Sequence, residues 1–241
     1  MEMNGNSILI TGGATGIGLS MAKYLYERGN TVLICDKRED RLSQTARELP
    51  KIQTIKCDVT SPNDRSALFA YVKEFFSDMN ILINNAGIQR DIDLTKGMID
   101  FESGESELRV NLEAPILLSA LFTPMLSEKK NATIVNVSSR LAFMPDFAAE
   151  MPIYHATKAG LHAFSLVQRK QLSSVGIRVI ELIPPAVQSE LNPARRKNRD
   201  ADQVPKMMPP DEFVKKVFAE IEQNIDEIML EERLLTEIDI S

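Results

Sequence analysis

Tyr154 and Lys158 have the residue types and the spacing for acid–base chemistry. On a helix, residues four apart lie on adjacent turns of one face, about one pitch from each other. A free tyrosine has a pKa near ~10, so bringing it to ~7 requires about 4 kcal/mol of stabilisation of the phenolate. A fixed ammonium nearby supplies part of this as an opposite charge. An ordinary helix-surface pair has the same spacing, so the rest of the chain decides between the two interpretations.

A glycine-rich segment near the start of the chain is typical of a phosphate-binding turn. The letters T-G-G-A-T-G-I-G at 11–18 separate an apolar run at 7–10 from a helical pattern over 17–28. Glycines let the backbone approach a phosphate closely, and a helix N-terminus offers free N–H groups. The spacing is T-G-x-x-x-G-x-G rather than G-x-G-x-x-G, and a plain glycine-rich turn is the alternative. The candidate contacts are Gly12, Thr15, Gly16, Ile17 and Gly18.

The β-branched, apolar segment 31–35 predicts a buried parallel strand that ends at Asp36. Asp36 lies 18 residues after Gly18, near the roughly 20-residue offset at which dinucleotide folds place an acid on the adenosine ribose. A carboxylate repels a 2′-phosphate by about 4 kcal/mol at ~4 Å and an effective dielectric near 20. Lys37 and Arg38 follow and can offset this repulsion. NAD is therefore modestly favoured over NADP, with a turn residue beside a solvated corner as the alternative.

Small and polar residues also follow the next two predicted strands. Residues 52–56 predict one strand, and residues 81–83 predict another that leads into N-N-A-G at 84–87. Small residues let a loop pack against a nucleotide, and asparagine amides can tie adjacent strands together. For Asp58, which follows the earlier strand, a strand-end cap is the alternative. The candidate nucleotide contacts are Asp58, Val59, Asn85, Ala86 and Gly87.

Asn111 and Ser139 are candidate polar residues in the second half of the chain. A long helix is predicted over about 107–127, with Asn111 one turn inside its start. Asparagine is a poor helix former, which indicates a local polar role, and a surface position is the alternative. A predicted strand over 133–137 ends in Ser138-Ser139, and another over 177–183 ends at Pro184-Pro185.

Strand-like and helix-like segments alternate along the chain, which predicts one parallel sheet with helices on both faces. The sequence is therefore interpreted as a single α/β domain over 1–241. Its ligand site is expected at the carboxyl ends of the strands, where every motif above falls. Residues 192–210, rich in charge and proline, are expected to be a mobile substrate lid.

The composition limits the classes of function. The chain has 241 residues with a net charge of −6, which argues against nucleic acid as a partner. No apolar run approaches the roughly 20 residues of a membrane span. Cys35 and Cys57 are expected to be reduced packing residues of a cytoplasmic protein. His155 and His162 are also interpreted as packing residues, and no metal site is expected.

Taken together, four motifs resemble the short-chain dehydrogenase/reductase family. T-G-x-x-x-G-x-G at 11–18, N-N-A-G at 84–87, N-V-S-S at 136–139 and Y-x-x-x-K at 154–158 occur in the family's order and approximate spacing. The resemblance covers about residues 7–191. It implies a doubly wound, Rossmann-like sheet of about seven strands, a nicotinamide cofactor, a small carbonyl or alcohol substrate, and a homodimer or homotetramer.

The resemblance also implies a role for each of four residues. Tyr154 is expected to exchange a proton with the substrate oxygen, while Ser139 stabilises the charge that develops there. Lys158 is expected to lower the tyrosine pKa and to hold the nicotinamide ribose, to which Tyr154 also lies close. Asn111 is expected to hold a water molecule of a proton relay. Hydride passes between the nicotinamide and the carbonyl carbon.

Two segments depart from the family pattern. Ser139 lies 15 residues before Tyr154, which leaves two extra residues in a segment that normally lines the substrate pocket. Pro184-Pro185 stands where the family has P-G, yet the Val187 backbone is still expected to meet the nicotinamide carboxamide. Pro184, Val187 and Ser189 are accordingly further candidate cofactor contacts.

L-A-F at 141–143, P-P-A-V at 184–187 and E-L at 190–191 resemble a bacterial subgroup named for its association with lipoteichoic-acid D-alanylation genes. The leading hypothesis is an NAD(P)-dependent oxidoreductase. The alternative is a nucleotide-sensing regulator with the same fold and no turnover, although such a regulator has no need of Tyr154. Phe143, Met144, Phe147 and Met151 suggest an apolar pocket wall, with core or subunit contacts as the alternative.

Overall fold

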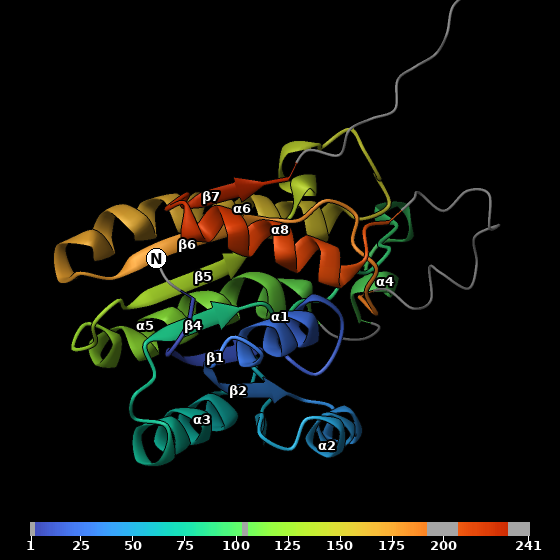
Figure 1. Ribbon diagram of the computed structural model, residues 1–241. Helices are drawn as coiled ribbons and strands as arrows, with labels where there is room; N and C mark the ends of the chain where they lie inside the picture. Colours follow the sequence, from blue (N-terminus) through green and yellow to red (C-terminus); the bar gives the residue numbers. More distant parts are fainter. Residues whose placement is uncertain (1–2, 103–105, 192–206, 231–241) are drawn as a thin grey trace, which may run out of the picture.

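A parallel sheet of seven strands runs through the molecule in the order β3-β2-β1-β4-β5-β6-β7. The computed structural model describes residues 3–102, 106–191 and 207–230 (Figure 1). The strands are β1 (Ser7–Thr11), β2 (Thr31–Asp36), β3 (Gln53–Lys56), β4 (Ile81–Asn84), β5 (Thr133–Val137), β6 (Arg178–Ile183) and β7 (Glu227–Met229). Strand order reverses between β1 and β4, which is the switch point where ligands bind in such sheets.

Helices cover both faces of the sheet, so the predicted Rossmann-like α/β fold is confirmed (Figure 1). One face packs against α1, α2 and α8, and the other against α3, α5 and α6. The helices are α1 (Gly16–Tyr26), α2 (Glu39–Glu48), α3 (Pro62–Phe75), α4 (Ile99–Glu102), α5 (Ala114–Leu126), α6 (Pro152–Leu172) and α8 (Pro210–Glu222). Among the described residues, none of these helices combines the length and the apolar character that crossing a membrane requires.

Burial on both faces explains why the central strands are continuous apolar runs. In β1, Ile8 and Ile10 belong to the core under α1, whereas Leu9 belongs to the core under α3 and α5. At one edge of the sheet, β1, β2 and β4 end in Thr11, Asp36 and Asn84, and Ser138 directly follows β5. The strand interiors therefore supply most of the core, and their carboxyl ends supply the candidate site.

A row of polar side chains crosses the sheet beneath α5 and α6. In register, Asn84 pairs with Asn136, Asn136 with Glu181, and Glu181 with Glu227. Because successive residues of a strand alternate between faces, these in-register partners share the face that α6 covers. Asn84 Nδ2 donates to Asn136 Oδ1 at 3.0 Å, so side chains as well as backbone groups join β4 to β5.

Only the end of the expected lid falls within the described residues. Residues 192–206 lie outside them, so the expectation of a mobile lid stays a prediction. Met208 pairs with the loop that follows β6, because its N–H donates to Ala186 O at 2.9 Å and its carbonyl accepts from Gln188 N at 3.0 Å. Residues 207–209 thus lie beside this loop and lead into α8.

Candidate active site

Helix α6 holds Tyr154 and Lys158 at the carboxyl edge of the sheet. Pro152 occupies its first turn, where the missing N–H costs no helical hydrogen bond. Tyr154 is 5% exposed and Lys158 is 4% exposed. Lys158 Nζ donates to Val137 O at 2.8 Å and lies 5.7 Å from the centre of the Tyr154 ring. The helix therefore buries both groups side by side at the end of β5.

Ser139, rather than Ser138, faces the Tyr154 phenol. A hydrogen bond from Ser139 opposes the rise in the pKa of Tyr154, which places the two hydroxyl groups in contact. Ser139 Oγ also accepts from Leu141 N at 3.2 Å. The Ser138 hydroxyl instead donates to Leu182 O at 3.4 Å, so it points toward β6. Strand alternation explains this difference between the two serines.

The two extra residues before Tyr154 do not displace Ser139. The chain forms a short 3₁₀ helix over Arg140–Phe143, and Ala148 adopts a left-handed conformation with φ 60°. His155 Nδ1 lies 2.7 Å from Leu141 O, which fastens this segment to α6. The extra length is taken up by the excursion between the 3₁₀ helix and α6. Of the residues expected to form an apolar wall, Phe143 and Phe147 are exposed and Met151 is buried.

Asn111 is fully buried, so the alternative of a surface position is wrong. It lies in a π-helical turn, Arg109–Glu113, which precedes α5 within the predicted long helix. Its Oδ1 accepts from Ile88 N at 2.8 Å, and its Nδ2 donates to Ile88 O at 2.8 Å and Thr157 Oγ1 at 3.3 Å. Both amide hydrogens are thus used within the protein. A Cβ on Gly87 would lie 3.4 Å from Asn111 Oδ1 and 3.8 Å from Lys158 Nζ.

Burial favours the neutral forms of both Tyr154 and Lys158. It raises the pKa of Tyr154 to about 12, which Ser139 opposes and the charge of Glu107 reinforces. Burial also lowers the pKa of Lys158 to about 8, against the attraction of Glu181. The expected lowering of the tyrosine pKa by Lys158 is therefore not found in the protein alone, because desolvation outweighs the charges around the phenol.

Glu107 is a residue of this site that the sequence analysis missed. It is 2% exposed, and its Oε1 accepts from Arg90 N at 3.2 Å. Burial raises its pKa to about 7, against the hydrogen bond and charge of Arg90 and with a smaller contribution from Asp91. Glu107 lies four residues before Asn111, on the same face of the helix. That spacing, with a carboxylate at the start of an otherwise apolar helix, was a signal available in the sequence.

The glycine loop before α1 fits the phosphates of a dinucleotide. A Cβ on Gly12 would lie 2.8 Å from Ala86 Cα, and one on Gly18 would lie 2.3 Å from Gly12 O, so neither position admits a side chain. Asn85 Nδ2 donates to Thr11 O and Gly12 O at 3.0 and 3.1 Å, which joins this loop to the end of β4. No side chain caps α1 at Thr15, and its first turn contains no acid. The helix N-terminus is thus open to an anion.

Arg38 forms an ion pair with the carboxylate of Asp36. Its Nε and Nη2 lie 3.0 and 3.1 Å from the two oxygens of the buried Asp36, a bidentate ion pair. Arg38 Nη2 also donates to Thr15 Oγ1 at 2.8 Å, and its Nη1 donates to Glu190 Oε2 at 3.2 Å. Asp36 and its neighbour Lys37 therefore lie at the expected corner, but Arg38 compensates the aspartate charge.

Some of the remaining candidate residues border the candidate nucleotide groove, and others only stabilise the strand end at which they lie. Asp58 Oδ1 accepts from Thr60 N and Thr60 Oγ1 at 2.8 and 2.7 Å, which is the strand-end cap that was the alternative interpretation. Val59 is buried in the core. A Cβ on Gly16 would meet Ser189 Cβ at 3.3 Å, so the loop after β6 packs on the first turn of α1. That turn includes Ile17, and the same loop carries Pro184 and Val187.

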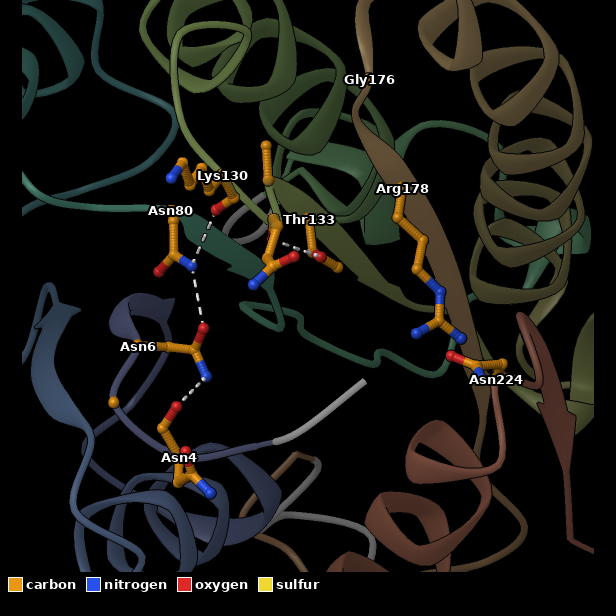
Figure 2. A pocket seen from close by; sticks show the side chains of 11 residues that line it. Asn4, Asn6, Asn80, Lys130, Thr133, Gly176, Arg178 and Asn224 are labelled. Atoms are coloured by element: carbon orange, nitrogen blue, oxygen red, sulfur yellow. Dashed lines mark hydrogen bonds between the residues drawn. The ribbon is translucent and has the colours of Figure 1, made fainter.

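A separate hollow of about 760 Å³ lies at the opposite, amino ends of the strands (Figure 2). Asparagines that bond to one another line part of it: Asn80 Nδ2 donates to Asn6 Oδ1 at 2.9 Å, and Asn6 Nδ2 donates to Asn4 O at 3.0 Å. None of the sequence-predicted site residues lines it. Helices of a parallel α/β fold end at this edge, so their carbonyls and negative dipole ends disfavour an anionic nucleotide there.

Comparisons with known proteins agree with the geometry. The family described as "short chain dehydrogenase" matches residues 6–200. The chain is 46% identical over 200 residues to the uncharacterized oxidoreductase DltE of Bacillus subtilis, covering 83% of this chain and 77% of that protein. DltE belongs to the D-alanylation subgroup that the sequence resembled.

Two solved structures share the fold. A short-chain dehydrogenase from Sphingobium yanoikuyae in complex with NADPH has a TM-score of 0.80 and 28% identity, covering 92% of this chain and 86% of that one. A short-chain dehydrogenase/reductase from Burkholderia phymatum in complex with NAD has a TM-score of 0.81 and 21% identity, covering 95% and 89%. At that identity, the second likeness concerns the fold alone.

Replacing Lys158 by methionine is expected to raise the melting temperature at pH 7. The fall in its pKa from 10.5 to about 8 means that a charged Lys158 destabilises the folded state by about 3 kcal/mol below pH 8. Between pH 8 and 10.5 the unfolded state binds more protons, so this cost declines and the gain from Lys158→Met shrinks. Melting curves at pH 7 and pH 10 measure it, with the exposed Lys170→Met on the same helix as control. A lower melting temperature at pH 7 would contradict the expectation.

Replacing Glu107 by glutamine is expected to lower the pKa of Tyr154, because the variant loses a negative charge that disfavours the phenolate. Phenolate absorbance followed through alkaline pH measures this, with Tyr154→Phe identifying the signal among the four tyrosines. Glu113→Gln removes an exposed carboxylate of the same helix and serves as the matched control. An unchanged titration in Glu107→Gln would show that the two groups are not coupled.

Proposed function

The chain belongs to the short-chain dehydrogenase family, and on that premise we propose that it is an NAD(P)-dependent oxidoreductase acting on a small carbonyl or alcohol substrate. The observation that carries the proposal is the buried contact of Tyr154 with Ser139, beside Lys158, at the carboxyl edge of the sheet. Relatives of this chain are named oxidoreductases, which supports the class of reaction.

Each polar residue of the site has a distinct part in the proposed reaction. Ser139 donates a hydrogen bond to the substrate oxygen, and Tyr154 gives that oxygen a proton or takes one from it. Lys158 holds the nicotinamide ribose, and Asn111 fixes the Gly87–Ile88 turn against which the ribose lies. When bound, the cofactor supplies or accepts the hydride, and its oxidised ring carries a positive charge.

The pKa of Tyr154 in the unliganded protein suits proton donation to a carbonyl substrate better than proton removal from an alcohol. A phenol with a pKa of about 12 keeps its proton at neutral pH and is ready to donate it. Forming the phenolate at pH 7 costs about 7 kcal/mol in this environment. For alcohol oxidation this cost has to be offset by positive charge brought in with the oxidised cofactor, since burial leaves Lys158 able to supply only part of it.

The proposed cofactor groove runs from the glycine loop to the loop after β6. The open N-terminus of α1 receives the pyrophosphate, and the Asp36–Arg38 corner receives the adenosine ribose. The proposed cofactor contacts are Gly12, Thr15, Gly16, Ile17, Gly18, Asp36, Lys37, Asp58, Val59, Asn85, Ala86, Gly87, Tyr154, Lys158, Pro184, Val187 and Ser189.

We keep both NAD and NADP as cofactors of this chain. The Sphingobium structure binds NADPH and the Burkholderia structure binds NAD. The bidentate Arg38–Asp36 pair removes much of the repulsion that a free carboxylate exerts on a 2′-phosphate. The modest preference for NAD, which weighed the charge of Asp36 against Lys37 and Arg38, is correspondingly weaker.

A homodimer or homotetramer is proposed from the exposed apolar residues of two helices. Leu117 on α5 and Leu166 and Val167 on α6 are exposed on the outside of the sheet's helical layer. Exposed apolar side chains grouped on neighbouring elements are typical of a subunit contact. Both cysteines are free thiols, which fits the proposed reducing environment of the cytoplasm.

Replacing Tyr154 by phenylalanine is expected to lower kcat by about 10²-fold or more, because general acid–base catalysis contributes about 10²–10⁴. The measurement is nicotinamide absorbance against a panel of carbonyls and alcohols, with cofactor affinity measured in parallel and Tyr24→Phe as control. Equal rates in the wild type and Tyr154→Phe would remove Tyr154 from the mechanism. Nucleotide binding without turnover on any substrate would favour the regulator over the enzyme.

Replacing Arg38 by alanine is expected to weaken NADPH binding at least about tenfold more than NADH binding, since Asp36 is left with an uncompensated charge. Asp36→Ala is expected to raise the affinity for NADPH relative to the affinity for NADH. Fluorescence titrations of both cofactors measure the affinities. Arg41→Ala is the matched control, because Arg41 also pairs with Glu190, at 3.0 Å, but its second acidic partner is Asp40 rather than Asp36. Equal losses of affinity for NADH and NADPH in Arg38→Ala would contradict the proposed role of the Asp36–Arg38 pair.

A further inference from the structure

His162, Glu181 and Glu227 converge from three elements that are distant in sequence. His162 lies on α6, Glu181 on β6 and Glu227 on the edge strand β7. One potential ligand atom from each residue lies within 4.8 Å of the other two. Glu181 and Glu227 are in-register partners of adjacent parallel strands, so both side chains project toward α6.

Glu181 is buried without full hydrogen bonding. It is 0% exposed. Its Oε2 lies 2.9 Å from His162 Nδ1, whereas its Oε1 is buried and has no hydrogen-bond partner in the described part of the chain. A buried carboxylate oxygen without a donor costs about 1–3 kcal/mol or more, because the group has lost its water. The position therefore calls for a cation or a further donor.

The neighbouring groups explain why no protein donor reaches this oxygen. The adjacent Asn136 uses both amide hydrogens on Ser165 Oγ and Gln168 Oε1, each at 2.9 Å. The Glu181 backbone N–H donates to Asp226 O at 2.8 Å. In this polar row the Asn136 amide is fully hydrogen-bonded, whereas Asn84 Oδ1 and Glu181 Oε1 have no partner among the described residues. Of these two oxygens, only the one on Glu181 belongs to a carboxylate.

We propose that His162, Glu181 and Glu227 form a binding site for one divalent transition-metal ion. An imidazole with two carboxylates suits Mn²⁺, Fe²⁺ or Zn²⁺ better than Mg²⁺ or Ca²⁺, which prefer oxygen ligands. Two ligands of one such ion lie at most about 4 Å apart. The three ligand atoms lie within 4.8 Å of one another, and a small movement of the Glu227 side chain, which is 43% exposed, would bring its carboxylate within the range that one ion allows. Binding displaces the proton that Nδ1 holds in its neutral donor form.

Two cations lie near the three residues. Lys158 is attracted by the charge of Glu181, and Arg169 Nη1 lies 3.8 Å from Glu227 Oε2. The Nε and Nη2 of Arg169 are held by Val179 O at 2.9 Å and Asp226 O at 2.8 Å, which directs the guanidinium along the backbone. Phe143 packs edge-on against His162 with ring centres 4.6 Å apart. His162 and Glu227 keep solvent exposure, so an ion has an entry route.

An ion at this position joins the helix that carries Tyr154 and Lys158 to the end of the sheet. The edge strand β7 has three residues and one neighbouring strand, so its pairing with β6 rests on few hydrogen bonds. Metal bonds from α6, β6 and β7 would fix these three elements together. The ion lies on the helix-covered face of the sheet and takes no part in the proposed hydride transfer.

Mn²⁺ binding, followed by the electron paramagnetic resonance of the free ion, tests the proposal with the full-length protein. Mn²⁺ is the probe because Cys35 and Cys57 can bind thiophilic metals such as Zn²⁺. One equivalent is expected to bind to the wild type, and His162→Gln and Glu227→Gln are each expected to weaken binding at least about tenfold. Glu128→Gln, which removes an exposed carboxylate at the end of α5, is expected to bind as the wild type does.

Melting curves with and without Mn²⁺ keep the test independent of folding defects. The wild type and Glu128→Gln are expected to gain melting temperature with the ion, while folded His162→Gln and Glu227→Gln gain little. Equal Mn²⁺ affinity in all four proteins would overturn the site, and so would the absence of stoichiometric binding to the wild type. In either case His162 and Glu181 form a hydrogen-bonded pair only. Turnover is not measured, so neither result bears on the proposed oxidoreductase function.

Discussion

The burial of an acid and a base together is the constraint on which the candidate site depends. Desolvation raises the pKa of Tyr154 and lowers the pKa of Lys158, so each group resists the charge that the other could stabilise. The fold maintains this arrangement by placing both residues on one helix and anchoring the ammonium on a β5 carbonyl. At neutral pH the Tyr154 phenol therefore keeps its proton beside a Lys158 that is still mostly charged. Positive charge that a ligand brings into the site would favour the phenolate, which couples the acid–base chemistry to occupancy of the proposed groove.

Local patterns were enough to predict the architecture and the residues at the strand ends. Apolar runs such as Leu9 and its neighbours identify parallel strands because only a sheet covered on both faces can bury them. Glycines at 12 and 18 identify the loop because the backbone of another segment occupies the space of a side chain. The spacing of Ser139 from Tyr154 departed from the family pattern, and the structure absorbs the difference in an excursion of the chain between them.

Interactions between distant segments were beyond sequence reasoning. Asp36 and Arg38 were both recognised, but nothing in their spacing showed that the guanidinium turns back onto the carboxylate. The charge of Glu107 acts on the Tyr154 phenol because the chain before α5 packs against α6. The raised pKa of Glu107 depends on burial that no local pattern reveals. His162 was interpreted as a packing residue because its candidate partners, Glu181 and Glu227, lie on strands far along the chain.

Glu190 links two arginines across the mouth of the nucleotide groove. Arg38 pairs with it at 3.2 Å and Arg41 at 3.0 Å, and all three side chains are partly exposed. Exposed ion pairs each contribute about 0–1 kcal/mol and weaken as salt shortens the Debye length. These ion pairs therefore weaken as ionic strength rises, so salt is expected to loosen the hold of the loop after β6 on the start of α2.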